Sequence, residues 1–119
     1  IILPLISTNK KKDEIEIALK ELISWLKIDK ILGMETVNLS QYEKRIVQFA
    51  RAIITRPRIL LLDSFFINLD PDLQKKISYL LLALKKIGTT IITFSTDIND
   101  SLLEYDESYK IKNFNLVKL

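Results

Sequence analysis

The feature that most constrains the fold is a strand, a helix and a second strand in direct succession. Ile59–Leu62 are four consecutive aliphatic residues, and Asp63 follows them. Such a run predicts a strand buried on both faces, as in a parallel sheet. Asp70 and Pro71 predict the N-cap and first turn of a helix, and the β-branched and aromatic residues 89–94 predict a second strand. The order predicts a right-handed βαβ unit and therefore an α/β fold.

Two helices are predicted before this unit. Apolar residues at spacings of three and four predict a helix over residues 13–28. Ser40 and Glu43 form a capping box, in which each side chain accepts a hydrogen bond from the backbone N–H of the other residue. We expect this second helix to run to about Thr55, because Pro57 ends it.

The C-terminal segment predicts a short helix followed by a hairpin. The helix is expected near residues 99–105, and the hairpin strands over residues 108–112 and 116–119. Asn113 and Asn115 are expected at the turn, because asparagine tolerates a positive φ.

Composition excludes several classes of site. The 119 residues contain no cysteine and no histidine, so disulfides, thiolate metal sites and a histidine base are excluded. No apolar run reaches the ~18 residues of a membrane span. The net charge of +3 is scattered, and the run Lys10–Lys12 is typical of a solvated loop, so we expect no nucleic-acid partner. The first residues lack a methionine and the pattern of a signal peptide, and we expect a partial chain.

Four segments, taken in order, resemble the ABC-type ATPases. Leu39–Glu43 resembles the signature motif, and Ile59–Asp63 resembles the Walker B strand. Asn68–Asp70 resembles the D-loop, and Thr90–Asp97 resembles the strand and switch loop. The resemblance implies a partial P-loop NTPase fold of ABC type, in which the half that carries Walker A is missing. Residues 1–56 would form the helical subdomain with its signature helix, and residues 57–119 the C-terminal part of the α/β core.

Details of three segments resemble one branch of the family most closely. The segments "IILPLI", "NLDPDLQKKI" and "GTTIITFSTDIN" are most similar to the cell-division ATPases of the FtsE type. The ATPases of lipoprotein release and macrolide export are sister families. The resemblance implies a homodimer of ATPase subunits and an FtsX-like, permease-like membrane partner. It also implies a cytoplasmic location at the inner face of the cell membrane.

The resemblance implies a site for ATP and Mg²⁺ between two subunits. A helix N-terminus favours phosphate through free N–H groups and its dipole. The signature helix would grip the γ-phosphate of ATP bound to the opposing subunit, and Asp63 would hold Mg²⁺. Asp70 would cap its helix and contact the opposing subunit. The implied nucleotide-binding residues are Leu39, Ser40, Gln41, Tyr42, Glu43, Asn68, Leu69 and Asp70.

The departures from the family pattern fall on the catalytic positions. Gln41 and Tyr42 replace the two signature glycines, so their side chains obstruct the approach of phosphate to backbone. Ser64 replaces the catalytic glutamate, and Thr96 replaces the switch histidine. Loss of acid–base assistance alone costs ~100- to 10,000-fold in rate. The Walker A loop and the Q-loop are also absent from these residues, so we expect no ATPase activity from this chain alone.

Other interpretations remain open at this stage. The chain could be a non-catalytic interaction protein derived from an ABC half, or a small α/β domain with coincidental motifs. Ser40 and Glu43 could form only a capping box, and Asp70 could serve only its helix. Tyr42, Phe65, Phe66 and Trp25 are more typical of a core or interface than of a stacking surface. Arg45, Arg51, Arg56 and Arg58 are more typical of solvated or paired helix ends than of a basic patch.

Overall fold

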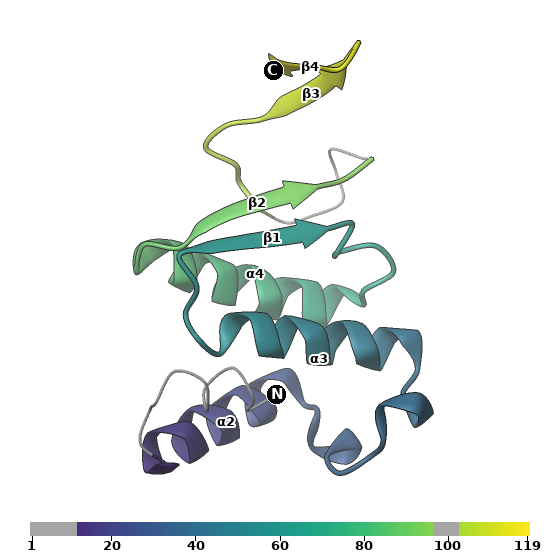
Figure 1. The fold of residues 1–119 in the computed structure, drawn as a ribbon, viewed down its shortest axis with the longest axis vertical. Helices are drawn as coiled ribbons and strands as arrows, with labels where there is room; N and C mark the ends of the chain where they lie inside the picture. The colour runs from purple at the N-terminus through teal and green to yellow at the C-terminus, as the bar shows by residue number, and fades with distance from the viewer. Residues whose placement is uncertain (1–11, 97–102) are drawn as a thin grey trace.

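The computed structural model describes residues 12–96 and 103–119, in which helices cover one face of a small parallel sheet and a hairpin follows (Figure 1). In chain order the elements are α2 (Lys12–Leu26), the 3-10 helices η1 (Asp29–Ile31) and η2 (Thr36–Asn38), α3 (Gln41–Ile53), β1 (Ile59–Asp63), α4 (Pro71–Lys86), β2 (Thr90–Phe94), β3 (Tyr109–Lys112) and β4 (Asn115–Lys118). Among the described residues, no helix is long and apolar enough to cross a membrane.

The predicted βαβ unit is confirmed. β1 and β2 pair in parallel, from Ile59 opposite Thr90 to Asp63 opposite Phe94, and α4 connects them. Two hydrogen bonds extend the pairing at its ends. The buried Thr89 donates its hydroxyl to the carbonyl of Pro57 at 2.7 Å, and the N–H of Ser64 bonds to the carbonyl of Phe94 at 2.8 Å.

The core lies between β1 and the helices α2, α3 and α4. Its deepest side chains are Ile46, Ile77 and Leu81, each no more than 2% exposed. Phe65 and Phe66 are buried as well, and their rings pack edge to face with centroids 5.6 Å apart. The core interpretation of these two aromatic residues is therefore confirmed.

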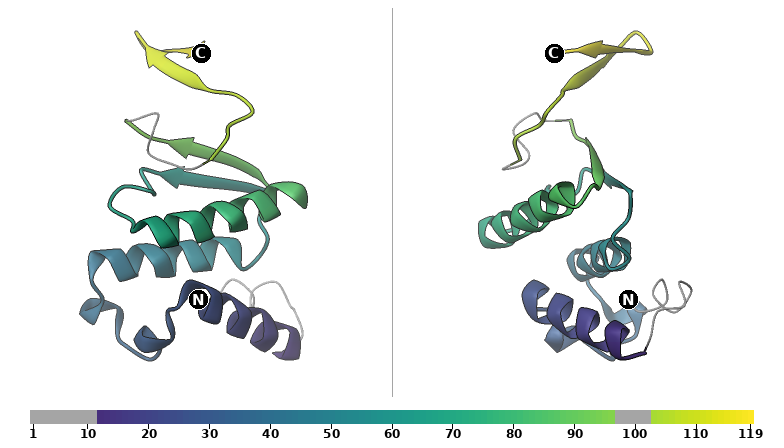
Figure 2. Two further views of the ribbon diagram at one scale, coloured as in Figure 1. Left: turned by 180° about the vertical axis from the view of Figure 1, so that it is seen from behind. Right: turned by 90° about the vertical axis from the view of Figure 1, so that its left-hand side faces the viewer.

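The prediction that β1 is buried on both faces is wrong for this chain. Leu60 and Leu62 face the helices and are buried, whereas Ile59 and Leu61 are each 62% exposed. Both views of Figure 2 agree with Figure 1 that α3 and α4 lie on one side of the sheet. Since no described element covers the other side, alternate aliphatic side chains of β1 face solvent.

The helix boundaries differ little from the predicted ones. α2 ends at Leu26, two residues before the predicted end, and α3 ends at Ile53. The capping box at Ser40 is confirmed, and so is the N-cap role of Asp70 with proline at the start of α4. After α4 the chain turns at Gly88, whose φ of +99° suits glycine.

The C-terminal hairpin is confirmed, but one of its turn residues was assigned wrongly. Asn113 has a φ of 48°, as expected, and Phe114 has a φ of 62°. Asn115 lies in β4 opposite Lys112, because the strand register leaves only two residues for the turn. The short helix predicted over residues 99–105 lies partly outside the described residues, and residues 103–105 are not helical.

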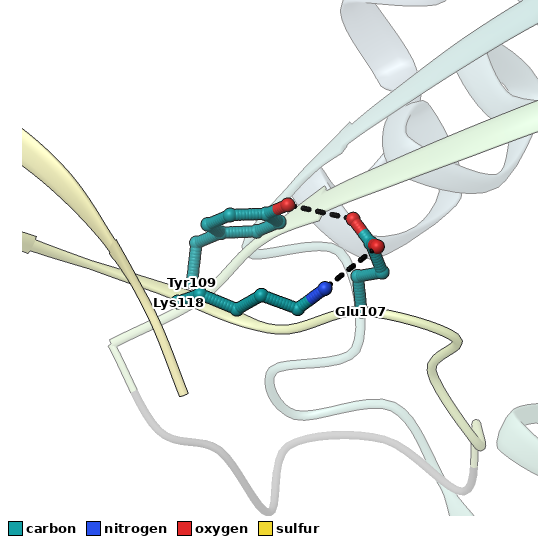
Figure 3. A network of polar contacts seen from close by, with 3 residues as sticks. All are labelled: Glu107, Tyr109 and Lys118. Carbon is teal, nitrogen blue, oxygen red and sulfur yellow. Dashed lines mark hydrogen bonds and ion pairs between the residues drawn. The ribbon is translucent and has the colours of Figure 1, made fainter.

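A polar network holds the base of the hairpin (Figure 3). Tyr109 donates its hydroxyl to Glu107 at 2.6 Å, and Lys118 forms an ion pair with the same carboxylate at 2.8 Å. These two hydrogen bonds lower the pKa of Glu107, the bond from Lys118 contributing most. Every residue of β3 and β4 is exposed, and the hairpin stands away from the other elements (Figure 1).

Candidate nucleotide-phosphate site

Two helix N-termini and the ends of two strands lie at one end of the sheet (Figure 1). α3 begins there after its N-cap Ser40, and α4 begins there after its N-cap Asp70. β1 ends there at Asp63 and β2 at Phe94. Carboxyl ends of parallel strands are where open α/β sheets bind ligands, and helix N-termini attract anions. Ser40, Asp63 and Asp70 therefore lie toward the same end of the sheet.

The capping box fixes the start of α3. Ser40 donates its N–H to Glu43 Oε2 at 2.8 Å, and Glu43 donates its N–H to Ser40 Oγ at 3.2 Å. The backbone hydrogen bond from Ser40 is the largest cause of a lowered pKa of Glu43, followed by the side-chain bond. The Glu43 carboxylate is therefore charged at neutral pH.

Tyr42 links the starts of the two helices. Its hydroxyl donates to Asp70 Oδ2 at 3.2 Å, while Asp70 Oδ1 accepts the N–H of Leu73 at 3.0 Å. Partial burial is the largest cause that raises the pKa of Tyr42, followed by its hydrogen bond to Asp70 and the charge of that carboxylate. Sequence reasoning did not predict this contact, because Tyr42 and Asp70 are 28 residues apart.

A cavity of about 390 Å³ opens between α2, α3 and α4. Its lining combines apolar side chains, such as Ile28 and Ile46, with the polar residues Ser40, Tyr42 and Asp70. Three lysines also line it, and none of them was singled out from the sequence: Lys27, Lys30 and Lys76. A cavity lined by both charged and apolar side chains suits a ligand with an ionised group.

Side chains of α3 and α4 hold the loop between β1 and α4. Arg45 Nη1 donates to the carbonyl of Ile67 at 2.6 Å. Gln74 Nε2 donates to the carbonyls of Leu69 and Phe66 at 3.1 and 3.3 Å. Arg45 therefore tethers this loop from the first half of α3 and does not lie at a helix end, as the sequence interpretation had placed it.

A family profile described as ABC transporter matches residues 4–66, more than half of the 119 residues. The chain belongs to the ABC transporter family. Lipoprotein-releasing system ATP-binding proteins LolD are similar to it: that of Neorickettsia sennetsu is 28% identical and that of Rickettsia bellii 32%. These alignments cover 98% and 95% of this chain, but 52% and 51% of the relatives.

Other ABC proteins match over less of their length. The spermidine/putrescine import ATP-binding protein PotA of Onion yellows phytoplasma is 31% identical over 88% of this chain and 26% of its own. The ADP-conformation structure of MJ1267, an ATP-binding cassette of an ABC transporter, superposes with a TM-score of 0.65. It is 24% identical, and the match covers 91% of this chain and 42% of that one, so it confirms the α/β fold of ABC type. The chain thus spans about half the length of the LolD relatives.

The positions that the ABC resemblance assigns to metal and catalysis lie near one another. Ser64, the first residue after β1, donates its hydroxyl to Asp63 Oδ1 at a long 3.4 Å. Thr96 is exposed two residues beyond the end of β2. The cavity between these strand ends is only about 10 Å³, too small for a nucleotide. In residues 12–96 and 103–119, no group of three or more Asp or Glu could hold a metal by itself.

The remaining assigned positions differ in exposure. Gln41 and Asn68 are exposed, and Asn68 has a φ of 59°, which asparagine tolerates. Leu39 and Leu69 are buried in the core. Only the backbone groups of these two leucines are therefore candidates for ligand contact.

Proposed function

We propose that this chain supplies the signature-helix half of an ABC ATP-binding subunit, which meets the phosphates of ATP bound to a second subunit. One observation carries the proposal: the N-caps Ser40 and Asp70 line a single cavity and are bridged by Tyr42. The N-terminus of α3 would meet a phosphate of the opposing subunit's ATP, and Asp63 would hold Mg²⁺. A second copy of the chain is the simplest opposing subunit.

The residues present could hold Mg²⁺ only together with water and substrate phosphates. Asp63 offers one exposed carboxylate, and Mg²⁺ is commonly held by one or two carboxylates, water and substrate phosphates. When bound, the metal would neutralise charge on the phosphates. Asp63 would hold it directly or through water, and the Ser64 hydroxyl would orient that carboxylate.

Hydrolysis at this site would be very slow. Ser64 and Thr96 carry hydroxyls where a carboxylate and an imidazole are expected, and neither hydroxyl is a general base at neutral pH. The Gly-rich loop that cradles phosphates is not among these residues, so another polypeptide segment must supply it. The chain would therefore contribute binding and dimer contacts rather than the reacting groups.

The proposal extends to the kind of transport system in which the chain would act. A permease-like membrane partner and a cytoplasmic position beneath it are expected for an ABC subunit. LolD relatives favour a system of the lipoprotein-release type, which the sequence had indicated as a sister family, and PotA relatives favour import of spermidine or putrescine. The FtsE-like role in cell division and the FtsX-like partner stay predictions from the sequence.

A second candidate function is favoured by the same departures. The Tyr42 hydroxyl already donates a hydrogen bond to Asp70 within the chain, and α3 begins with two bulky side chains, Gln41 and Tyr42. A degenerate ABC half of this kind could bind a partner protein and hydrolyse nothing. In that case the N-cap residues would only stabilise the fold and would bind no nucleotide.

The decisive experiment uses the complete gene product, purified with any membrane partner that accompanies it. Mg·ATP affinity and turnover are measured for the wild type, for Asp63→Asn and for the surface control Lys110→Gln. The ABC proposal expects binding that Asp63→Asn weakens and Lys110→Gln leaves unchanged. Absence of Mg·ATP binding by the wild type would overturn it in favour of the interaction protein.

A further inference from the structure

Three lysines line the cavity, and no described carboxylate forms an ion pair with any of them. Lys27 and Lys30 lie in the segment after α2, and Lys76 lies on α4. The ion pairs of the described residues join Lys85 to Asp106 and Lys118 to Glu107, and neither involves the cavity. Lys76 lies close to Lys27, and this proximity is the largest cause of a lowered pKa of Lys76. Neighbouring ammonium groups repel each other unless an anion lies between them.

The acidic residues of the same cavity are already engaged. Glu43 accepts the N–H of Ser40, and Asp70 accepts from Leu73 with one oxygen and from Tyr42 with the other. Asp72 favours the charged form of Lys76, but its effect is smaller than that of Lys27. No described carboxylate of the cavity forms an ion pair with these amines, so their hydrogen-bond donors are available to an anion.

We propose that Lys27, Lys30 and Lys76 bind a phosphate group in this cavity, beside the N-termini of α3 and α4. The inference deepens the proposed function and rests on it where the phosphate belongs to a nucleotide. In the family pattern, glycine backbone grips the phosphate, whereas Gln41 and Tyr42 crowd that approach here. Three amines on the neighbouring wall would replace the lost backbone contacts with charge-assisted hydrogen bonds.

The geometry favours a compact polyphosphate over a bulky anion. The cavity of about 390 Å³ is large enough for a pyrophosphate group with its water, and it is open at the surface. Lys27 and Lys30 come from the segment after α2, whereas Lys76 comes from α4. Three amines that line one cavity can hold the oxygens of two linked phosphates.

The test is calorimetric titration of pyrophosphate, inorganic phosphate and ATP into the protein at low salt. The variant Lys27→Gln with Lys76→Gln keeps side-chain length and removes both charges. Its matched control is Lys110→Gln with Lys112→Gln, the same charge change on the exposed hairpin. We expect saturable pyrophosphate binding that the cavity variant weakens at least about tenfold and the control leaves within about twofold. Competition between ATP and pyrophosphate would identify a nucleotide as the source of the bound phosphate group. Binding of inorganic phosphate without such competition would identify free phosphate as the ligand.

Two results would overturn the inference. One is no pyrophosphate binding by the wild type, and the other is an equal loss in the hairpin control, which would mean non-specific attraction.

Failure of this inference is separable from failure of the ABC proposal. Mg·ATP binding that is sensitive to Asp63→Asn but unaffected in the cavity variant would leave the ABC proposal standing and refute the lysine site. Lysine-dependent pyrophosphate binding without any Mg·ATP binding would support the lysine site and refute the ABC proposal.

Discussion

Replacing Tyr42 should separate its hydrogen bond from the bulk of its ring. Tyr42→Phe removes only the hydroxyl that donates to Asp70 at 3.2 Å. Because Tyr42 is 41% exposed, this bond should contribute near the low end of the usual range, about 0.5 kcal/mol. Tyr42→Gly also removes a half-buried ring, worth about 1 kcal/mol, and lowers helix propensity by about 0.5 kcal/mol. The glycine variant should therefore lose about 2 kcal/mol of unfolding free energy.

Urea denaturation followed by circular dichroism measures both losses. With a slope of about 2 kcal/mol/M, the midpoint should fall by about 1 M for Tyr42→Gly and by about 0.3 M for Tyr42→Phe. Asp70→Ala removes the same contact and the N-cap, so the double variant with Tyr42→Phe should be less destabilised than the sum of the single variants.

The same variants test the proposal that the Tyr42 ring obstructs the approach of phosphate to the start of α3. The glycine variant should bind Mg·ATP more tightly than the wild type in the complete gene product, although it is less stable. Tyr42→Phe should not, because its ring still covers the helix start. A glycine variant that is as stable as the wild type, or that binds nucleotide more weakly, would refute this account of Tyr42.

Three further predictions concern the caps and the exposed faces. Ser40→Ala should cost about 1 kcal/mol of unfolding free energy, measured in urea, and a loss below about 0.2 kcal/mol would show that the capping box is dispensable. Because the pKa of Glu43 is lowered in the folded state, its carboxylate contributes fully to the unfolding free energy above pH 4.5, its usual pKa. This contribution is lost as the pH falls through the lower pKa of the folded state. Glu43→Gln should remove this pH dependence from the unfolding midpoint, and an unchanged pH profile would contradict the prediction. The aliphatic face of β1 should drive self-association, so Leu61→Lys should lower the mass found by light scattering, whereas Ile87→Lys, on an equally exposed side chain at the C-cap of α4, should not.

The sequence predicted the parts of the fold that depend on neighbours in the chain. The caps of α3 and α4 follow from Ser40 with Glu43 and from Asp70 with Pro71, because their hydrogen bonds span three residues. The parallel pairing of β1 and β2 follows from their apolar runs and the helix between them.

Features that depend on tertiary contacts were not predicted. The bonds from Tyr42 to Asp70 and from Arg45 to Ile67 join residues 28 and 22 positions apart. The three lysines of the cavity come from separate segments, and nothing in their spacing indicates a shared site. The prediction that both faces of β1 are buried was wrong for a physical reason. An apolar run indicates that a strand can be buried, whereas the layers that pack on it decide whether it is.

The most direct test of the ABC account is association of two copies in the presence of nucleotide. Sedimentation velocity on the complete gene product, with and without Mg·ATP, would compare the wild type with Asp63→Asn, Ser40→Ala and Lys110→Gln. The account predicts that Mg·ATP shifts the wild type and the lysine control toward a dimer and that the other two variants respond weakly. Association that is the same with and without Mg·ATP, or equal responses of all four proteins, would contradict it.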